Sequence, residues 1–255
     1  MSENQKPPLS IIIPIYNEKE NISDVITEVI EKVTPLYDLD LIIIDDGSED
    51  DVISVLESAK QTHPLLQVAS HPKRSGKSAA LRTGMLLAKH LWVATMDGDG
   101  QDDPQNILNM AETINTNQVN EIGLVAGNRT SRTDGNNRKI ASRMANGLRK
   151  NLLKDNCPDT ACGLKIIPKE LFLALPFFDA LHRYLPALTN HLGFKTINVP
   201  VTNRPRASGQ SKYSNIGRAF AGLFDLFGVV WLMKRTQSPA PHFLMKSSLI
   251  EKTIK

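Results

Sequence analysis

The sequence is poor in several features that mark whole classes of protein. It has two cysteines, Cys157 and Cys162, with no histidine at zinc-site spacing, so we expect buried thiols rather than a disulfide framework or a zinc site. Aromatic residues make up 5% of the chain and no RNA- or DNA-reading motif is present, which disfavours a nucleic-acid partner. No apolar run reaches the ~18 residues of a membrane-spanning helix, so none is expected.

The beginning of the chain also lacks the marks of an exported protein. Residues 1–8 are polar and contain neither the basic region nor the apolar core of a signal peptide, which favours a cytoplasmic location. With 255 residues, of which 41% are hydrophobic, the chain can bury a substantial core. We expect one large globular domain followed by a smaller C-terminal appendage.

Charge is distributed unevenly along the sequence, although the net value is +3. Residues 1–128 hold 9 Lys and Arg against 20 Asp and Glu, a net −11, whereas residues 129–255 hold 21 against 7, a net +14. An acidic half concentrates cations and a basic half attracts anions. The distribution suits a metal-bound diphosphate held between the halves, or a basic face on an anionic membrane.

The most informative stretch is an apolar strand that runs directly into acidic residues. Between Trp92 and Pro104 the chain carries Asp97, Asp99 and Gln101, with a glycine between each pair. Because glycine lets the backbone bend, the three side chains can turn toward one point. Such oxygen ligands select Mg²⁺ or Mn²⁺, which usually share their coordination with phosphate. A solvated acidic loop is the alternative interpretation.

Strand and helix signals alternate through the first hundred residues. The expected strands span residues 9–16, 41–44, 66–70 and the stretch leading to Asp97, and the expected helices span 21–33, 50–61 and 77–90. This α/β order predicts a mostly parallel sheet flanked by helices, with ligands beyond the carboxyl ends of the strands. We expect the helix at 77–90 to be structural, because His71 replaces the first glycine that a phosphate-binding loop would need.

Three short motifs resemble those of the family 2 glycosyltransferases, which have the GT-A fold. They are Pro14-Ile15-Tyr16-Asn17-Glu18, Asp45-Asp46-Gly47-Ser48 and Asp97-Gly98-Asp99-Gly100-Gln101. Within that family the chain is similar to the polyprenyl- and dolichol-phosphate sugar transferases, through residues 127–129, 159–165 and 204–213. The resemblance implies that one sugar moves from UDP or GDP to a lipid phosphate, with inversion at the anomeric carbon and a divalent metal. Asn203 stands where many relatives carry histidine.

The resemblance also implies roles for individual residues. The residues implied for the base and ribose are Pro14, Tyr16, Glu18, Ile44 and Asp46. Those implied for the Mg²⁺ or Mn²⁺ ion on the diphosphate are Asp97, Asp99 and Gln101, with Gly98 also binding the donor. A metal and fixed cations suit this chemistry, because the nucleotide leaving group develops negative charge.

Basic residues in the second half of the chain are the candidate cations. The resemblance implies that Arg129, Arg206 and Lys212 contact the donor diphosphate, and that Arg206 and Lys212 act in catalysis together with Asp99. Asp159 is a candidate base, although an ionised acceptor phosphate hardly needs a strong one. Asp159 either orients the acceptor or simply caps the turn after Pro158. The arginines that either receive the lipid phosphate or form a solvated face are Arg132, Arg138, Arg143 and Arg149.

The last pattern is an aromatic stripe near the C-terminus. Within residues 215–235, aromatic residues recur at helical spacing at Phe220, Phe224, Phe227 and Trp231. The apolar part is too short to cross a bilayer, so we expect an amphipathic interfacial helix on the membrane surface, or a helix packed on the sheet. The expected division is a GT-A catalytic domain at 1–212 and a membrane-surface helix with a tail at 213–255.

Together these patterns predict an inverting, metal-dependent hexosyltransferase. It would move a mannose- or glucose-type sugar from GDP or UDP to polyprenyl phosphate, as a peripheral protein on the cytoplasmic face of the membrane. Two alternatives stay open: a soluble glycosyltransferase acting on a glycan or a protein, and a non-catalytic subunit that binds nucleotide sugars. A homo-oligomer is compatible with the sequence.

Overall fold

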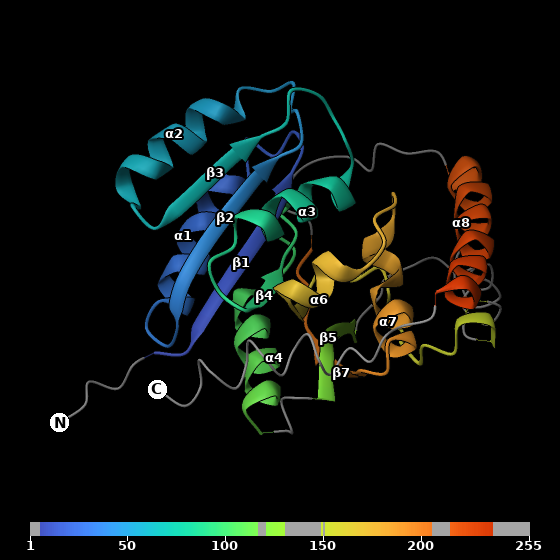
Figure 1. Ribbon diagram of the computed structural model, residues 1–255. Helices are drawn as coiled ribbons and strands as arrows, with labels where there is room; N and C mark the ends of the chain where they lie inside the picture. Colours follow the sequence, from blue (N-terminus) through green and yellow to red (C-terminus); the bar gives the residue numbers. More distant parts are fainter. Residues whose placement is uncertain (1–5, 117–120, 131–148, 150, 206–214, 237–255) are drawn as a thin grey trace.

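A seven-stranded sheet runs through the computed structural model, in the order β3-β2-β1-β4-β6-β5-β7 (Figure 1). The structure describes residues 6–116, 121–130, 149, 151–205 and 215–236. The strands are β1 (Pro8–Ile15), β2 (Asp38–Asp45), β3 (Leu66–Ser70), β4 (Trp92–Thr95), β5 (Ile122–Arg129), β6 (Lys165–Pro168) and β7 (Lys195–Val201). Strands β1 to β4 pair in parallel, as do β5 and β7, whereas β6 runs antiparallel to β4 and β5. The expected mostly parallel sheet is therefore confirmed.

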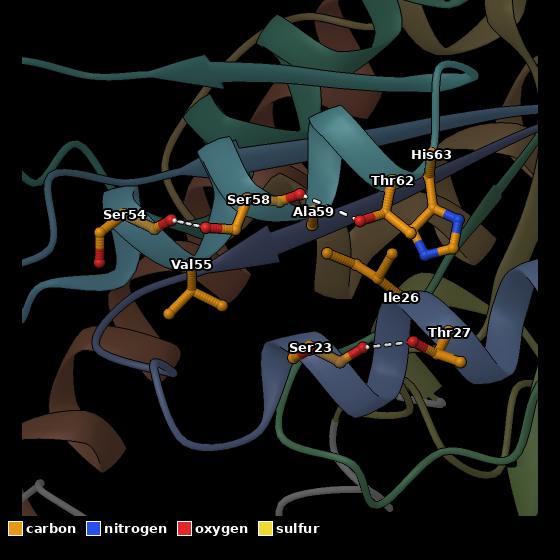
Figure 2. A pocket seen from close by; sticks show the side chains of 9 residues that line it. All are labelled: Ser23, Ile26, Thr27, Ser54, Val55, Ser58, Ala59, Thr62 and His63. Carbon is orange, nitrogen blue, oxygen red and sulfur yellow. Dashed lines mark hydrogen bonds between the residues drawn. The ribbon is translucent and has the colours of Figure 1, made fainter.

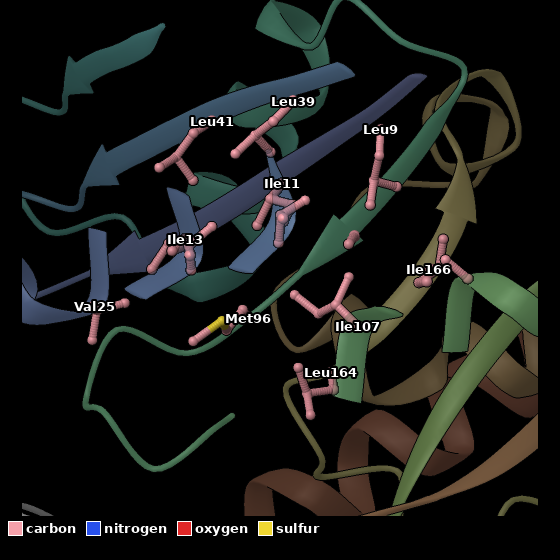
Figure 3. Close-up of a cluster of buried hydrophobic side chains, with 14 of the residues drawn as sticks. Leu9, Ile11, Ile13, Val25, Leu39, Leu41, Met96, Ile107, Leu164 and Ile166 are labelled. Carbon is pink, nitrogen blue, oxygen red and sulfur yellow. The ribbon is translucent and has the colours of Figure 1, made fainter. Parts of the chain in front are cut away.

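Helices cover both faces of this sheet (Figure 1). They are α1 (Ile22–Val33), α2 (Val52–Thr62), α3 (Lys77–Leu87), α4 (Pro104–Thr116), α6 (Lys169–Ala174), α7 (Leu181–His191) and α8 (Asn215–Arg235). Alternate residues of β1 point to opposite faces, so Ile11 and Ile13 share a core cluster with α1, α2 and α4, while Ile12 shares the other cluster with α3, α6 and α7. Figure 3 shows part of the first cluster, with residues of α1 and α4 beside Ile11 and Ile13. Burial on both faces explains why the strands read as continuous apolar runs.

Two elements differ by three residues or more from their predicted lengths. Strand β2 is longer than 41–44, because it pairs with β1 from Asp38 onward. Helix α3 ends at Leu87 rather than at residue 90. The reason is a polar pair in the neighbouring strands: the backbone N–H of Lys89 donates to Asp40 at 2.9 Å, and that of His90 donates to Ser10 at 3.2 Å. These bonds replace the ones that would continue the helix.

Helix α8 spans the residues expected from the aromatic stripe, and it packs against α7. Leu226 and Val229 are buried in the second core cluster, and the Tyr184 hydroxyl of α7 donates to the carbonyl of Gly222 at 3.2 Å. None of the described helices combines the length and apolar character needed to cross a bilayer.

Candidate functional site

The loops that follow β1 and β2 are joined where the two strands end. The backbone N–H of Asn17 donates to the Ser48 hydroxyl at 2.8 Å, and the Asn17 side chain accepts from the N–H of Glu49 at 2.8 Å. Because β1 and β4 also pair in parallel, the chain that follows β4 leaves from the same edge of the sheet. The three predicted motifs therefore share one edge, as the order of the strands predicts.

Asp46 holds the next loop of the chain in place. Its buried carboxylate lies 2.8 Å from Nδ1 of His71 and accepts the backbone N–H groups of Ser75 at 2.9 Å and Gly76 at 2.8 Å. Gly47 makes room for this loop, since a Cβ at that position would lie 2.5 Å from the Lys73 carbonyl carbon. With both its oxygens engaged, Asp46 shapes the loop at residues 71–76.

The other residues implied for the nucleoside occupy different environments. The Arg74 guanidinium lies 4.2 Å from the centre of the Tyr16 ring, which places a cation over an aromatic face at the open edge. Glu18 lies in the turn before α1, where its carboxylate accepts from the Asn21 side-chain amide at 2.8 Å. Ile44 is fully buried in the core, so any contact that it makes with a ligand uses its backbone, whereas Pro14 is half-buried on β1.

The carboxylate of Asp97 forms an ion pair with a lysine of a helix that we expected to be structural. This lysine is Lys77, the first residue of α3. Burial is the largest single influence and raises the pKa of Asp97, but the charge and hydrogen bond of Lys77, together with the charge of Lys165, leave the pKa below its usual value. Gly163 lets the carboxylate fit, because a Cβ there would lie 2.6 Å from an Asp97 oxygen.

A second lysine and a histidine lie near this ion pair. Lys165 is buried, its ammonium donates to the carbonyls of Thr160 and Cys162, and burial lowers its pKa. Burial, then the charges of Lys77 and Lys165, lower the pKa of His182 to about 2, so its imidazole is neutral. No motif pointed to His182, and it comes near only because α3 and α7 pack together. Lys165 is the last residue of segment 159–165, one of the segments that carry the resemblance to the family, and this was the only sequence signal for it.

The acidic loop, residues 97–103, closes on itself. The carboxylate of Asp102 accepts the backbone N–H of Asp97 at 3.2 Å, and that of Asp99 accepts the N–H of Gln101 at 3.3 Å. Gly100 makes the turn with a φ of +74°. Burial, and then the charge of Asp97, raise the pKa of Asp102 to about 7. Asp102 therefore braces the loop from inside.

The donor set of this loop fits a divalent cation. Asp97 and Asp99 carry carboxylate oxygens and Gln101 carries an amide oxygen, and all three residues lie in the loop that follows β4. Among the described residues no three His, Cys, Asp or Glu side chains gather as a metal site. Mg²⁺ and its relatives commonly take one or two carboxylates and complete their coordination with water and substrate phosphate.

Arg129 and Asp159, which the resemblance gave separate roles, are paired with each other. The Arg129 guanidinium makes two bonds to the Asp159 carboxylate, Nε to Oδ2 at 2.6 Å and Nη2 to Oδ1 at 2.9 Å. Asp159 is 4% exposed and Arg129 21% exposed at their side chains. The hydrogen bonds to Asp159 raise the pKa of Arg129. A carboxylate held in such a fork is poorly placed to accept a proton.

Replacing Asp159 by asparagine is expected to destabilise the fold, because Arg129 would keep a half-buried charge without its partner. The expected loss is about 3 kcal/mol, or about 6 to 12 °C in Tm for a chain of this size. Thermal unfolding followed by circular dichroism measures it. The control is Glu121→Gln, which breaks the exposed pair with Lys195 and should cost less than ~1 kcal/mol. A variant with unchanged Tm and abolished turnover would instead favour the base.

Several predicted site residues lie outside the described residues. These are Arg206, Lys212, Arg132, Arg138 and Arg143. Arg149 is described and is buried: it pairs with Asp155 and donates to the Cys157 carbonyl at 2.6 Å, so it is structural rather than a receptor for lipid phosphate. Cys157 and Cys162 are buried free thiols, as expected.

A pocket between α1 and α2 is separate from these residues (Figure 2). Hydroxyl groups line it, but most of them donate to the helix backbone: Thr27 to Ser23 at 3.0 Å, Ser58 to Ser54 at 2.9 Å and Thr62 to Ser58 at 3.3 Å. None of its lining residues belongs to the candidate site.

The sequence is similar to that of known transferases. A sequence model described as Glycosyl transferase family 2 matches residues 10–175. The chain is 29% identical to the dodecaprenyl-phosphate galacturonate synthase of Rhizobium johnstonii, over 94% of this chain and 71% of that protein. It is 30% identical to the undecaprenyl-phosphate 4-deoxy-4-formamido-L-arabinose transferase of Sodalis glossinidius, over 81% of this chain and 63% of that protein.

Solved structures confirm the GT-A fold. Glucosyl-3-phosphoglycerate synthase from Mycobacterium tuberculosis, in complex with Mn²⁺, UDP and glucosyl-3-phosphoglycerate, matches with a TM-score of 0.68 at 20% identity, over 91% of this chain and 82% of that chain. A mannosyltransferase from Pyrobaculum calidifontis in complex with GDP-Man and Mn²⁺ matches with a TM-score of 0.67 at 22% identity, over 94% and 68%.

Proposed function

The chain belongs to glycosyl transferase family 2, and on that premise we propose that it moves one hexose-type sugar from UDP or GDP to polyprenyl phosphate. The observation that carries this proposal is the shared edge of the sheet, where Tyr16, the loop held by Asp46 and the acidic loop come together. The names of two relatives support the acceptor, because each combines a polyprenyl phosphate with a sugar: dodecaprenyl phosphate with galacturonate, and undecaprenyl phosphate with 4-deoxy-4-formamido-L-arabinose.

In the proposed reaction an oxygen of the acceptor phosphate forms a bond to the anomeric carbon, while the bond from that carbon to the nucleoside diphosphate breaks. The configuration inverts, and the nucleoside diphosphate leaves with the bonding electron pair. A Mg²⁺ or Mn²⁺ ion on Asp97, Asp99 and Gln101 would neutralise the charge that develops on the leaving group. The ammonium of Lys77, which pairs with Asp97, adds a fixed positive charge at the same place.

The acceptor phosphate supplies its own nucleophile. Its second pKa is about 6, so it is mostly ionised near neutral pH and needs little help from a base. The fork between Arg129 and Asp159 supports a structural role for Asp159. Arg206 and Lys212 stay proposed as the cations that stabilise the leaving group.

A screen of sugar nucleotides tests the donor half of the proposal. UDP- and GDP-sugars are added with and without Mn²⁺, and the Tm of the protein is measured. A true donor held at about 100 times its Kd should add about 2.7 kcal/mol to the stability, and only when metal is present. If no UDP- or GDP-sugar stabilises the protein, the donor assignment is wrong. Metal-dependent stabilisation without any transfer would favour the non-catalytic subunit.

We also propose that α8 lies on the membrane surface at the cytoplasmic face, with 213–255 as a surface-binding appendage to the catalytic domain at 1–212. The aromatic side chains that α8 turns away from α7 are highly exposed: Phe224 is 83%, Phe227 58% and Trp231 63% exposed. Phe220 lies outside the side chains that the structure describes. Exposed rings on one helix face, followed by Lys234 and Arg235, are typical of an interfacial helix.

Charging this stripe should weaken membrane binding. The variant Phe224→Glu with Trp231→Glu is expected to lose sedimentation with vesicles containing anionic lipid, because two charges would have to enter the headgroup region. Affinity for the sugar nucleotide should be retained. The control is Leu86→Glu, which charges an apolar residue on α3 that is as exposed as Trp231. Raised salt should weaken binding of the parent, since each Lys or Arg near an anionic surface contributes about 1 kcal/mol. Unchanged sedimentation of the double variant would contradict the proposal that α8 binds the membrane surface.

A further inference from the structure

A short strap, residues 202–204, runs beside the acidic loop after β7 ends. Asn203 and Asp102 form an isolated antiparallel bridge, and the backbone N–H of Arg204 donates to the Gln101 carbonyl at 2.8 Å. The carbonyl of Thr202, the residue before Asn203, accepts from the side-chain amide of Asn106 at 2.9 Å. All three strap residues are therefore tied to the acidic loop or to the start of α4.

The side chain of Arg204 fastens this strap to α1. Its guanidinium makes two bonds to Glu28, at 2.7 and 2.9 Å, and a third contact to Asp103 at 2.7 Å. Lys32 completes the cluster by contacting Glu28 at 2.9 Å and Asp103 at 2.7 Å. The hydrogen bond to Glu28 is the main cause that raises the pKa of Arg204. Because the inner face of α1 is buried in the core, Glu28 is a rigid anchor.

Arg204 also fixes the orientation of Gln101. The Nε2 amide of Gln101 donates to the Arg204 carbonyl at 3.3 Å. A carbonyl oxygen accepts and never donates, so the nitrogen end of the side chain must face Arg204. The amide oxygen is then the atom through which Gln101 would bind a cation. One arginine thus grips both the backbone and the side chain of a proposed metal ligand.

We propose that Arg204 is a positioning residue, which holds the acidic loop and the amide of Gln101 in the geometry that binds the divalent cation. This inference rests on the proposed function, since it takes Asp97, Asp99 and Gln101 as the ligands. Arginine suits the task because its planar fork bonds two carboxylates in fixed directions, whereas the ammonium of lysine acts as a point charge. Residues that orient metal ligands affect metal affinity without touching the metal.

The affinity for Mn²⁺ alone tests the proposal, with Arg204→Gln and Arg204→Lys compared with the parent by calorimetry. Positioning predicts that both variants bind Mn²⁺ about 10- to 100-fold more weakly. A purely electrostatic role predicts a different pattern. Arg204→Gln would then bind Mn²⁺ more tightly, because a cation has been removed beside an acidic loop, and Arg204→Lys would be unchanged. The sign of the change separates the two roles.

A second variant and a second measurement guard against a general loss of folding. Glu28→Gln removes one anchor and leaves Arg204 its contact with Asp103, so we expect a smaller weakening in the same direction. In the metal-free protein, the backbone amide of residue 204 should be less protected from exchange with solvent in all three variants than in the parent. The control is again Glu121→Gln, which should leave both the affinity and the exchange unchanged.

Two failures are distinguishable. If the parent binds Mn²⁺ and Arg204→Gln binds it equally well or more tightly, or if the Arg204 amide exchanges at the parental rate, Arg204 does not position the loop and the proposed function stands. If the parent itself binds no Mn²⁺, with or without UDP or GDP, the proposed metal-dependent function fails and this inference fails with it.

Discussion

Replacing Asp99 by asparagine is expected to lower the affinity for Mn²⁺, and for a sugar nucleotide in the presence of Mn²⁺, by at least about 100-fold. The physical reason is the small donor set, since Asp99 is one of only two carboxylates proposed to bind the cation directly. The fold should survive, because Asp99 lies in the loop after β4 and belongs to neither core cluster. Calorimetric titration with Mn²⁺ and with UDP or GDP measures the loss.

The matched control is Asp24→Asn, which removes an exposed carboxylate from the first turn of α1. It changes the net charge by the same amount, and it should leave the affinity for Mn²⁺ within about twofold, because an exposed charge that does not bind the cation is screened by water and salt. Equal affinity in the parent and in Asp99→Asn would remove Asp99 from the metal site.

Alanine at Arg206 or at Lys212 is expected to slow sugar transfer by roughly ten- to a thousand-fold, with a smaller effect on donor binding. Each cation is asked to stabilise charge that develops as the nucleoside diphosphate leaves, which corresponds to about 1.4 to 4 kcal/mol of the barrier. Single-turnover measurement of transfer, beside calorimetric measurement of donor affinity, separates the two effects. The control is Lys60→Ala, an exposed lysine near the end of α2. Turnover within about twofold of the parent in both variants would make the segment a linker.

Much of the fold could be read from local patterns. The strands β1 and β2 are buried on both faces, so their continuous apolar runs located them. Because parallel strands end at the same edge of the sheet, the polar residues that follow them could be expected to lie together there. The bounds of α3 could not be read in this way. Its end depends on Asp40 and Ser10, two polar residues in distant strands that capture the next backbone N–H groups.

The site was harder to predict where contacts join distant segments. The pair of Lys77 and Asp97 joins the start of α3 to the loop after β4. The one signal around Lys77 was a weak likeness to a phosphate-binding loop, which His71 argued against, and it did not point to Asp97. Arg129 and Asp159 were both visible as candidates, but their fork depends on how the chain returns to the sheet through β6. Arg204 likewise gains its role from Glu28, which lies on a helix near the start of the chain.

Transfer of label to lipid tests the central claim most directly. The protein is incubated with Mn²⁺, undecaprenyl phosphate in detergent and the radiolabelled UDP- or GDP-sugar that stabilises it most, and the mixture is extracted with organic solvent. We predict that label enters the organic phase only when protein, metal and lipid phosphate are all present, and that Asp99→Asn abolishes this transfer. Label that stays in the aqueous phase, from a preparation that binds the same sugar nucleotide with Mn²⁺, would contradict a polyprenyl-phosphate acceptor.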